Sequence, residues 1–527
     1  MRDRSPVEVA DDGLEHRLGR LLPGGRRFDR NRSKILKKLT SSQRYDVLRR
    51  SNSLEEPIFS ARIDETPIPV PPYINGMISM RGVTSTLRHL FLFLPGLVFS
   101  VATLSQAQVR TCPNSTMIGN WQGTMSRQGA DVAVAFDFVC ADTDLQVSFT
   151  SLQQRAMEYP FDSAKQNGNQ VVLMLGGDTN FSGKFDEREL SGTFKDGDGS
   201  GTFRLIRVGD RQLPYSGSDV VFKNGDVTLS GSLYIPRGGG RYPAIVMLQG
   251  SGPETRWGAN RFWADYFGRR GIAALIYDKR GSGKSTGDWK TADFNALAGD
   301  ALAAVDFLQH QAGIDPKKIG IHGHSQGASI APLVASKSKS VAFVLADAAS
   351  GVPMWQSELF SQESYVRELG FKGDDLVNAD RFIERAVQVE RTGSGRDALI
   401  RDHKAALQSE QAWAKETEPP PADSYFWKFF PMIANYNPAD HWKHVNVPVL
   451  IVEAGNDERV PVEPSVAAIQ TALREGHNPD YTIVVFPNAP HTLVERPKTG
   501  EPFRWPHITP GYADLLASWV LYRESGK

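Results

Sequence analysis

Between residues 119 and 208, hydrophobic and polar residues alternate in short runs that glycine, aspartate and asparagine interrupt. A period of two places every second side chain on the same face, so the pattern is typical of strands with one buried face. It predicts a small antiparallel β domain over residues 108–210. The alternation is clearest in residues 132–136, 145–149, 171–175 and 201–206.

After residue 214 the pattern changes to apolar runs that are separated by segments with helical spacing. Residues 297–308, for example, carry apolar side chains at intervals of three and four. This alternation is typical of an α/β domain with a mostly parallel sheet, which we predict over residues 214–527. The predicted strands lie at residues 220–222, 227–234, 244–248, 273–277, 319–321, 341–345, 449–452 and 482–486.

The interval from about residue 351 to residue 443 is too long for a connection inside a compact sheet. Its helical patterning predicts a cap over the active site of the α/β domain. The interval is rich in large aromatic residues, which we expect to form mainly the core of this cap. These residues are Trp355, Phe360, Trp413, Phe426, Trp427, Phe429 and Phe430.

Residues 77–107 have the pattern of a signal peptide. Arg81 and Arg88 precede an apolar run over residues 90–104, and Ser-Gln-Ala follows at residues 105–107. The run is shorter than the roughly 20 residues of a membrane-spanning helix, which favours cleavage after Ala107 over a signal anchor or a buried helix. We therefore predict a secreted or periplasmic protein without stable membrane insertion.

Residues 1–76 precede this signal although a signal peptide must begin the chain to be recognised. They are polar and rich in arginine. We interpret them as an overextended start, with Met77 or Met80 as the initiator. A disordered basic tail is the competing interpretation.

The chain has two cysteines, Cys112 and Cys140, and both follow the predicted cleavage site. An exported protein folds under oxidising conditions, so we predict a Cys112–Cys140 disulfide that contributes about 3 kcal/mol. Two separate buried thiols are the competing interpretation. No histidine stands at metal-ligand spacing from either cysteine, which argues against a zinc site.

The net charge of the chain bears only on the kinds of partner that it does not favour. Lysine plus arginine and aspartate plus glutamate both number 60, so the formal net charge is zero. No overall field therefore favours nucleic acid or an anionic membrane as a partner. The sequence indicates no metal and no organic cofactor, and it leaves the oligomeric state open.

Residues 323–327 read Gly-His-Ser-Gln-Gly and match the nucleophile-elbow pattern G-x-S-x-G. They follow a predicted strand and precede a helix of small residues, which is the setting in which this pattern has physical meaning. The sharp turn predicts that any side chain at Gly323 or Gly327 would collide with a neighbouring strand or helix. Ser325 is therefore the predicted nucleophile.

A serine hydroxyl needs a base within hydrogen-bond distance and a carboxylate that holds this base in one tautomer. Chain order in such a fold is serine, acid, histidine, so we assign Asp457 as the acid and His491 as the base. Both follow predicted strands. Glu453 and Glu458 compete for the acid, and His477 and His507 compete for the base, whereas His322 and His324 are interpreted as packing around the elbow.

The oxyanion of the transition state needs backbone N–H donors. We predict Gln326 as one donor and Ser251 as the other, with Gly250 as the alternative, because residues 249–253 form a small-residue loop after a strand. Residues 281–286 resemble a phosphate loop, but Asp278 stands where that motif requires glycine. We interpret this segment as a turn that Asp278 and Arg280 stabilise.

With these motifs in view, the chain from about residue 230 onward resembles secreted bacterial α/β-hydrolases related to dienelactone hydrolases, prolyl oligopeptidases and serine aminopeptidases. The matching segments are residues 249–253, 277–285 and 323–327, with Asp457 and His491. In these relatives the first segment usually begins with histidine, and Gln249 stands there in this chain. Residues 119–123 and 190–194 also resemble the small β domain that often precedes such hydrolases.

The resemblance implies hydrolysis of a small-molecule carboxylic ester through an acyl-enzyme. A peptidase or amidase is the main competing function, but the sequence shows no charged group that would bind a peptide terminus. A catalytically silent ligand-binding protein of the same fold is the third hypothesis, and the complete Ser-Asp-His set argues against it.

Overall fold

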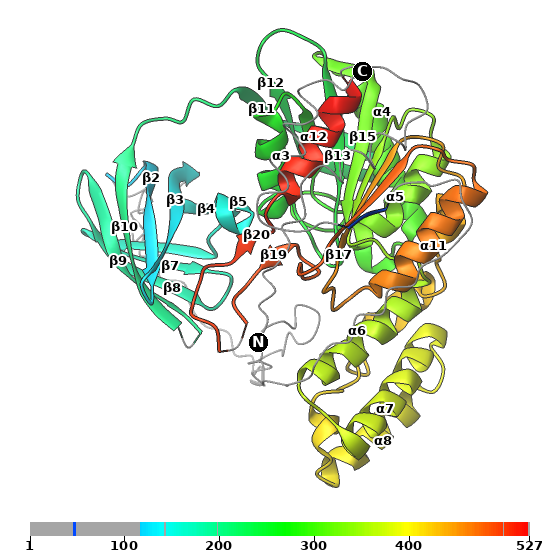
Figure 1. The fold of residues 1–527 in the computed structure, drawn as a ribbon. Helices are drawn as coiled ribbons and strands as arrows, with labels where there is room; N and C mark the ends of the chain where they lie inside the picture. The colour runs from blue at the N-terminus through cyan, green and yellow to red at the C-terminus, as the bar shows by residue number, and fades with distance from the viewer. Residues whose placement is uncertain (1–45, 49–115, 142–143, 198, 499, 525–527) are drawn as a thin grey trace, which may run out of the picture.

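The computed structural model describes residues 46–48, 116–141, 144–197, 199–498 and 500–524. Two large sheets divide this part of the chain into a β domain and an α/β domain (Figure 1). The predicted signal peptide and Cys112 lie outside the described residues. Cys140 lies near the end of a strand of the β domain. Because Cys112 is outside the described residues, the Cys112–Cys140 disulfide stays a prediction.

The β domain is a nine-stranded sheet in which every neighbouring pair is antiparallel, in the order β5-β4-β3-β2-β10-β9-β8-β7-β6. The four alternating segments of the sequence lie in β3, β4, β7 and β10, so the predicted antiparallel sheet is confirmed. The strands are β2 (Gly119–Arg127), β3 (Ala130–Ala141), β4 (Asp144–Ser151), β5 (Ala156–Pro160), β6 (Ser163–Asn167), β7 (Gln170–Leu175), β8 (Thr179–Phe185), β9 (Glu189–Asp196) and β10 (Gly199–Val208). The short helix η1 (Leu152–Gln154) joins β4 to β5.

Aromatic rings fill the inside of this curved sheet. Phe136 contacts Phe181 edge to face at 5.4 Å between ring centroids, and both residues pack against Phe203. Edge-to-face pairs of this kind add to the free energy of simple burial. The alternation in the sequence therefore places apolar side chains from one face of the sheet into a single core.

The α/β domain contains a second nine-stranded sheet, in the order β1-β18-β17-β16-β15-β13-β14-β12-β11. The six strands from β14 to β18 along this order are parallel to one another, and β1, β12 and β11 are antiparallel to their neighbours. The strands are β1 (Asp46–Leu48), β11 (Tyr215–Asn224), β12 (Val227–Pro236), β13 (Tyr242–Leu248), β14 (Ala273–Tyr277), β15 (Ile314–His324), β16 (Val344–Asp347), β17 (Val449–Ala454) and β18 (Tyr481–Phe486). β1 belongs to the segment that the sequence analysis expected to be disordered or absent, and its backbone pairs with β18.

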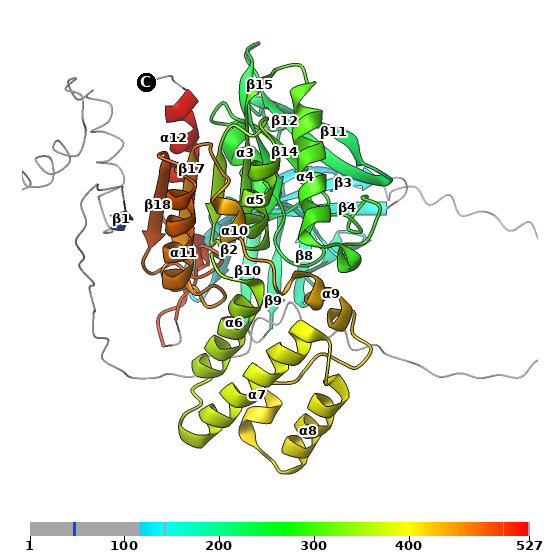
Figure 2. The same ribbon diagram turned by 90° about the vertical axis from the view of Figure 1, so that its right-hand side faces the viewer.

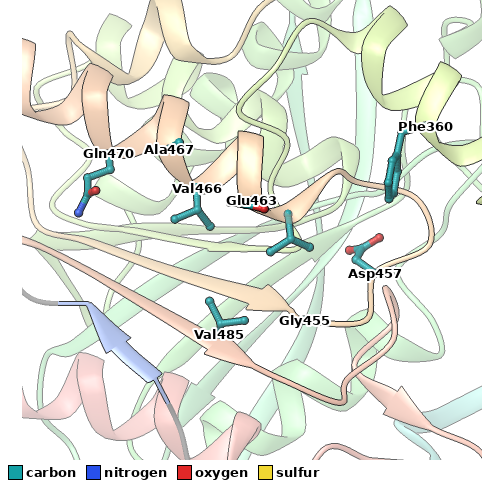
Figure 3. A pocket seen from close by; sticks show the side chains of 9 residues that line it. Phe360, Gly455, Asp457, Glu463, Val466, Ala467, Gln470 and Val485 are labelled. Carbon is teal, nitrogen blue, oxygen red and sulfur yellow. The ribbon is translucent and has the colours of Figure 1, made fainter. Parts of the chain in front are cut away.

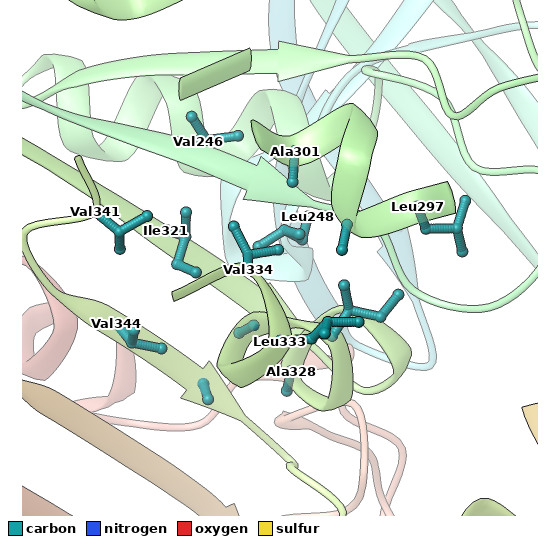
Figure 4. Packing of buried hydrophobic residues seen from close by; sticks show 14 of the residues in the cluster. Val246, Leu248, Leu297, Ala301, Ile321, Ala328, Leu333, Val334, Val341 and Val344 are labelled. Atoms are coloured by element: carbon teal, nitrogen blue, oxygen red, sulfur yellow. The ribbon is translucent and has the colours of Figure 1, made fainter. Parts of the chain in front are cut away.

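Helices cover both faces of this sheet (Figure 2). The spacing of apolar residues in the sequence explains one of them, since Leu297, Ala301 and Leu308 all lie buried on α4. They meet Val246 and Ile321 of the sheet in a packed core (Figure 4). The helices around the sheet are α3 (Ala259–Gly268), α4 (Phe294–Gln309), α5 (Gln326–Lys337), α11 (Val462–Glu475) and α12 (Tyr512–Glu524).

The long insertion forms a helical cap between β16 and β17, as predicted, and it projects from one end of the sheet (Figure 2). Trp413 and Trp427 are buried in the cap's own core, which confirms their predicted role. Phe429 and Phe430 instead join the core of the α/β domain. The cap consists of α6 (Met354–Glu368), α7 (Gly373–Thr392), α8 (Arg396–Gln408), η3 (Ala412–Lys415), α9 (Phe426–Ile433) and α10 (Ala439–Trp442).

The β domain is docked on the α/β domain through β5 and the start of α3. The backbones of Met157 and Gly258 exchange two hydrogen bonds, at 3.3 and 3.1 Å. Next to them Glu158 accepts two hydrogen bonds of 2.8 Å from the buried guanidinium of Arg261. A charge-assisted pair with this fork geometry fixes orientation as well as adding energy.

Candidate active site

Ser325 lies on a sharp turn between β15 and α5. Its backbone has φ 56° and ψ −118°, outside the regions that L residues normally occupy. A Cβ atom at Gly323 would lie 2.3 Å from the backbone of Gly327, and one at Gly327 would lie 2.7 Å from the Leu248 carbonyl oxygen. The steric prediction for both glycines is therefore confirmed, and the turn matches the geometry of a nucleophile elbow.

The three predicted triad residues are brought together by loops at the carboxyl ends of three parallel strands. His491 Nε2 lies 2.9 Å from Ser325 Oγ, and His491 Nδ1 lies 2.7 Å from Asp457 Oδ2. Asp457 Oδ1 accepts the backbone N–H groups of Arg459 and Val460, at 2.7 and 2.8 Å. These two bonds orient the carboxylate, which in turn orients the imidazole.

The competing acidic residues occupy other positions. Glu453 is buried inside β17, where burial raises the pKa of its carboxyl group well above the usual value. Glu458 accepts the backbone N–H of His491 at 3.1 Å, so it fixes the histidine loop and not the ring. Of the three carboxylates, Asp457 is the one that contacts the His491 imidazole.

The competing histidines lie away from the nucleophile. His477 follows α11 in a turn with φ 56°, and His507 in β20 (His507–Ile508) lies 3.6 Å from Glu495. His324 is half-buried, and its ring lies 5.3 Å from that of His491. Burial first, and then the neighbouring His491, holds the pKa of His324 well below its ordinary value, so this ring is neutral and part of the packing.

A second histidine–aspartate pair lies beneath the elbow. The His322 imidazole is hydrogen-bonded to Asp347 Oδ2, which also accepts a hydrogen bond of 2.6 Å from the Tyr512 hydroxyl. The His322 and Trp263 rings meet edge to face, with 5.4 Å between their centroids. The Asp347 carbonyl oxygen accepts the backbone N–H of Ser325 at 3.0 Å, so this buried pair is linked to the elbow.

The predicted oxyanion residues lie on two separate segments beside Ser325. Gln326 begins α5, where the first N–H groups of a helix have no partner inside the helix. In the loop after β13, the Gly250 N–H already donates to Glu254 Oε2 at 2.9 Å. That bond favours Ser251 over Gly250 as the second donor.

One buried cation near this loop was missed from the sequence. Lys279 is 3% exposed, and its Nζ donates to the Gly250 carbonyl oxygen and to Gln326 Oε1, both at 2.7 Å. Burial lowers the pKa of its amine to about 8, although Glu254 acts in the opposite direction. The neighbouring Asp278 and Arg280 stabilise the turn as predicted, through Arg256 and Asp300 respectively.

An open cavity of about 530 Å³ adjoins Asp457 (Figure 3). Phe360 of α6, Val466 of α11 and Val485 of β18 line it. Ser325 and His491 do not line this cavity, so it lies behind the acid and is not assigned to the acyl group.

Among the described residues, no group of three or more His, Cys, Asp or Glu side chains is arranged to hold a metal ion. In the same part of the chain, no helix has both the length and the apolar character that a membrane crossing requires.

Comparison with known proteins identifies the fold. Residues 245–499 match the Alpha/beta hydrolase family. Together with the order of the parallel strands and the elbow, this match shows the α/β-hydrolase fold that the sequence predicted, preceded by an antiparallel β sheet. It supports a hydrolytic enzyme with a small-molecule substrate.

Individual relatives share a modest fraction of identical residues with this chain. The chain is 25% identical to Esterase EstD of Thermotoga maritima over 359 residues, which are 65% of this chain and 79% of that protein. It is 36% identical to Polyketide transferase ATR5 of Stachybotrys chlorohalonatus over 135 residues, which are 25% of this chain and only 43% of the transferase. Among solved structures, a hypothetical protein of Pseudomonas aeruginosa aligns with a TM-score of 0.39 and 17% identity, over 59% of this chain and 94% of the other.

Proposed function

We propose that this enzyme of the α/β-hydrolase fold cleaves carboxylic esters through an acyl-enzyme on Ser325. The observation that carries the proposal is the continuous chain of hydrogen bonds from Asp457 through His491 to Ser325 Oγ, with links of 2.7 and 2.9 Å. Distances of this size allow direct proton transfer between the hydroxyl and the imidazole.

In the first half of the reaction, Ser325 Oγ attacks the ester carbonyl carbon while its proton passes to His491 Nε2. The negative charge that develops on the carbonyl oxygen is stabilised by the N–H groups of Gln326 and Ser251. Collapse of the tetrahedral intermediate expels the alcohol, which takes the proton from His491. Asp457 keeps the imidazole in the tautomer with its proton on Nδ1 and stabilises the imidazolium.

In the second half, His491 accepts a proton from water as the water oxygen attacks the acyl carbon. The second tetrahedral intermediate uses the same two N–H donors. Its collapse releases the carboxylic acid and returns the proton to Ser325. No group other than the triad and the backbone donors is needed for either half.

A series of p-nitrophenyl acyl esters tests the proposal in the full chain and in its Ser325→Ala variant. We expect turnover by the native chain and its loss in the variant, and the chain length with the highest kcat/KM measures the acyl site. A native chain that reacts with a fluorophosphonate but hydrolyses no ester, and instead cleaves aminoacyl anilides, would replace the esterase with a peptidase. A folded chain that does not react with the fluorophosphonate and hydrolyses neither esters nor anilides would indicate a silent binding protein.

We also propose that the protein is exported and cleaved after Ala107. The support is the basic, apolar and small-residue pattern of residues 77–107. Mass spectrometry of the protein from separated cell fractions tests this proposal. A mature chain beginning at Gln108 outside the cytoplasm is expected, and an intact chain in the cytoplasm would contradict it.

A further inference from the structure

Lys279 is buried at the junction of the two segments that carry the proposed oxyanion donors. Its Nζ bonds to the loop after β13 through the Gly250 carbonyl oxygen, and to α5 through Gln326 Oε1, with 2.7 Å in each case. Lysine is almost never fully buried without a partner of opposite charge, because desolvation of its ammonium is costly. Lys279 has the Glu254 carboxylate near it but donates to two neutral oxygens, one on each of the two segments, which points to a role in positioning them.

The bond to Gly250 has a direct consequence for Ser251. The Gly250 carbonyl and the Ser251 N–H belong to the same planar peptide unit and point in opposite directions. A cation bound to the carbonyl oxygen therefore fixes the direction of the N–H. It also polarises the peptide, because hydrogen bonds in sequence strengthen one another in a low-dielectric site.

Other contacts hold the same loop from its remaining sides. Glu254 Oε2 accepts the Gly250 backbone N–H, and the Glu254 carbonyl oxygen accepts the backbone N–H of Lys279 at 3.1 Å. Gln249, which stands where the resembling proteins usually have histidine, donates to the Tyr277 carbonyl oxygen at 2.6 Å. The loop is thereby fixed on both sides of the Gly250–Ser251 peptide.

We propose that Lys279 is a positioning residue that aligns and polarises the Gly250–Ser251 peptide and ties it to Gln326, so that both N–H donors converge on the ester oxygen. The proposal rests on the esterase function above. It assigns to the cation an effect on the charged transition state, which should appear in kcat, because the neutral ester in the ground state gains little from a stronger donor.

Charged and aromatic groups from several elements surround the Lys279 amine. Glu254 is the charged group on the oxyanion loop, and α5 contributes the uncharged Gln326. The helix η2 (Trp289–Thr291) places the Trp289 ring 5.9 Å from Lys279 Nζ, and the exposed Lys290 lies 5.8 Å from the same ring. On the lysine's own loop, Asp278 and Arg280 are engaged by Arg256 and Asp300.

Three variants of the full chain test the proposal. Lys279→Met removes charge and donors, and Lys279→Gln keeps a donor without the charge. Lys290→Met is the matched control at an exposed lysine near the same Trp289 ring. We expect Lys279→Met to lower kcat about 10- to 100-fold, less than the loss of an oxyanion donor itself, with KM changed less than threefold. Lys279→Gln should retain an intermediate kcat, and Lys290→Met should behave as the native chain.

The pH profile separates positioning from a merely structural role. Because the amine titrates at about pH 8, kcat of the native chain should fall as the pH rises through this value, and the fall should be absent in Lys279→Gln. A kcat that is unchanged in both Lys279 variants, or an alkaline fall that persists in Lys279→Gln, would overturn the proposal. If Lys279→Met does not fold, the kcat and pH profile of Lys279→Gln decide alone.

The failure of this proposal is distinct from the failure of the esterase function. Native turnover that depends on Ser325 but not on Lys279 would reject only the positioning role. Absence of Ser325-dependent turnover in the native chain would reject the esterase function, and the Lys279 proposal with it.

Discussion

The two histidine–aspartate pairs of the α/β domain have similar chemistry and different surroundings. His491 and Asp457, the outer pair, lie on loops after β18 and β17, and the His491 ring contacts the Ser325 hydroxyl. His322 and Asp347, the inner pair, lie inside β15 and β16, where Tyr512 and aromatic rings enclose them. The comparison shows that the type of residue does not decide its role. A pair on loops beyond the strands can meet a substrate, whereas a pair within the strands can only support the elbow.

The largest effect is expected for Ser325→Ala. Removal of the nucleophile from a working triad lowers kcat by about 10⁶-fold, or roughly 8 kcal/mol of transition-state stabilisation. Ester turnover checks the rate, and circular dichroism checks that the fold is unchanged. A variant with more than a few per cent of native turnover would mean that another group is the nucleophile.

Asp457→Asn tests the outer pair with little change in shape. The amide no longer holds the imidazole in the required tautomer, so we expect kcat to fall by about 10⁴-fold, or roughly 5.5 kcal/mol. The melting temperature should change little. Equal activity of the variant and the native chain would assign the acid to another residue, and Glu458→Gln serves as the matched control.

Asp347→Ala tests the inner pair and should show the opposite balance. Removing one partner of a buried pair leaves the other uncompensated, so the free energy of unfolding should fall by about 3–5 kcal/mol. Urea unfolding measures this loss. The folded fraction should retain turnover within about tenfold of native, because Asp347 does not contact the nucleophile's base. A rate loss as large as that of Asp457→Asn would mean that the inner pair takes part in catalysis.

Tyr512→Phe should have the smallest effect. It removes one hydrogen bond to the Asp347 carboxylate, worth about 1.5–3 kcal/mol, and keeps the packing of the ring against Trp263. Urea unfolding should show this decrease with unchanged KM. An unaltered unfolding free energy would indicate that Asp347 finds another donor.

The sequence predicted that Ser325, Asp457 and His491 lie close together, because the fold imposes their order along the chain. The elbow at residues 323–327 combines two glycines with a strand and a helix, and Asp457 and His491 each follow a recognisable apolar strand. The partner of His322 was not predictable, since it depends on the register between β15 and β16. That register pairs His322 with Leu345 and His324 with Asp347, and the His322 side chain reaches the Asp347 carboxylate.

Lys279 shows a second limit. In the sequence it stands between Asp278 and Arg280, and the three charged residues look equivalent. Only the fold shows that the side chains on either side form ion pairs at the turn while the lysine points inward. The docking of Glu158 on Arg261 was hidden in the same way, because it joins residues 103 positions apart.

The backbone pairing of Met157 with Gly258 has a consequence for how the chain can be divided. Gly258 lies eight residues after Gly250, so the β domain contacts the same segment that carries the proposed oxyanion donor. Removing the β domain by a cut near residue 212 would remove the two hydrogen bonds between Met157 and Gly258. We therefore expect an α/β domain expressed alone to turn over esters more slowly than the full chain, and a substitute β domain would have to reproduce this edge.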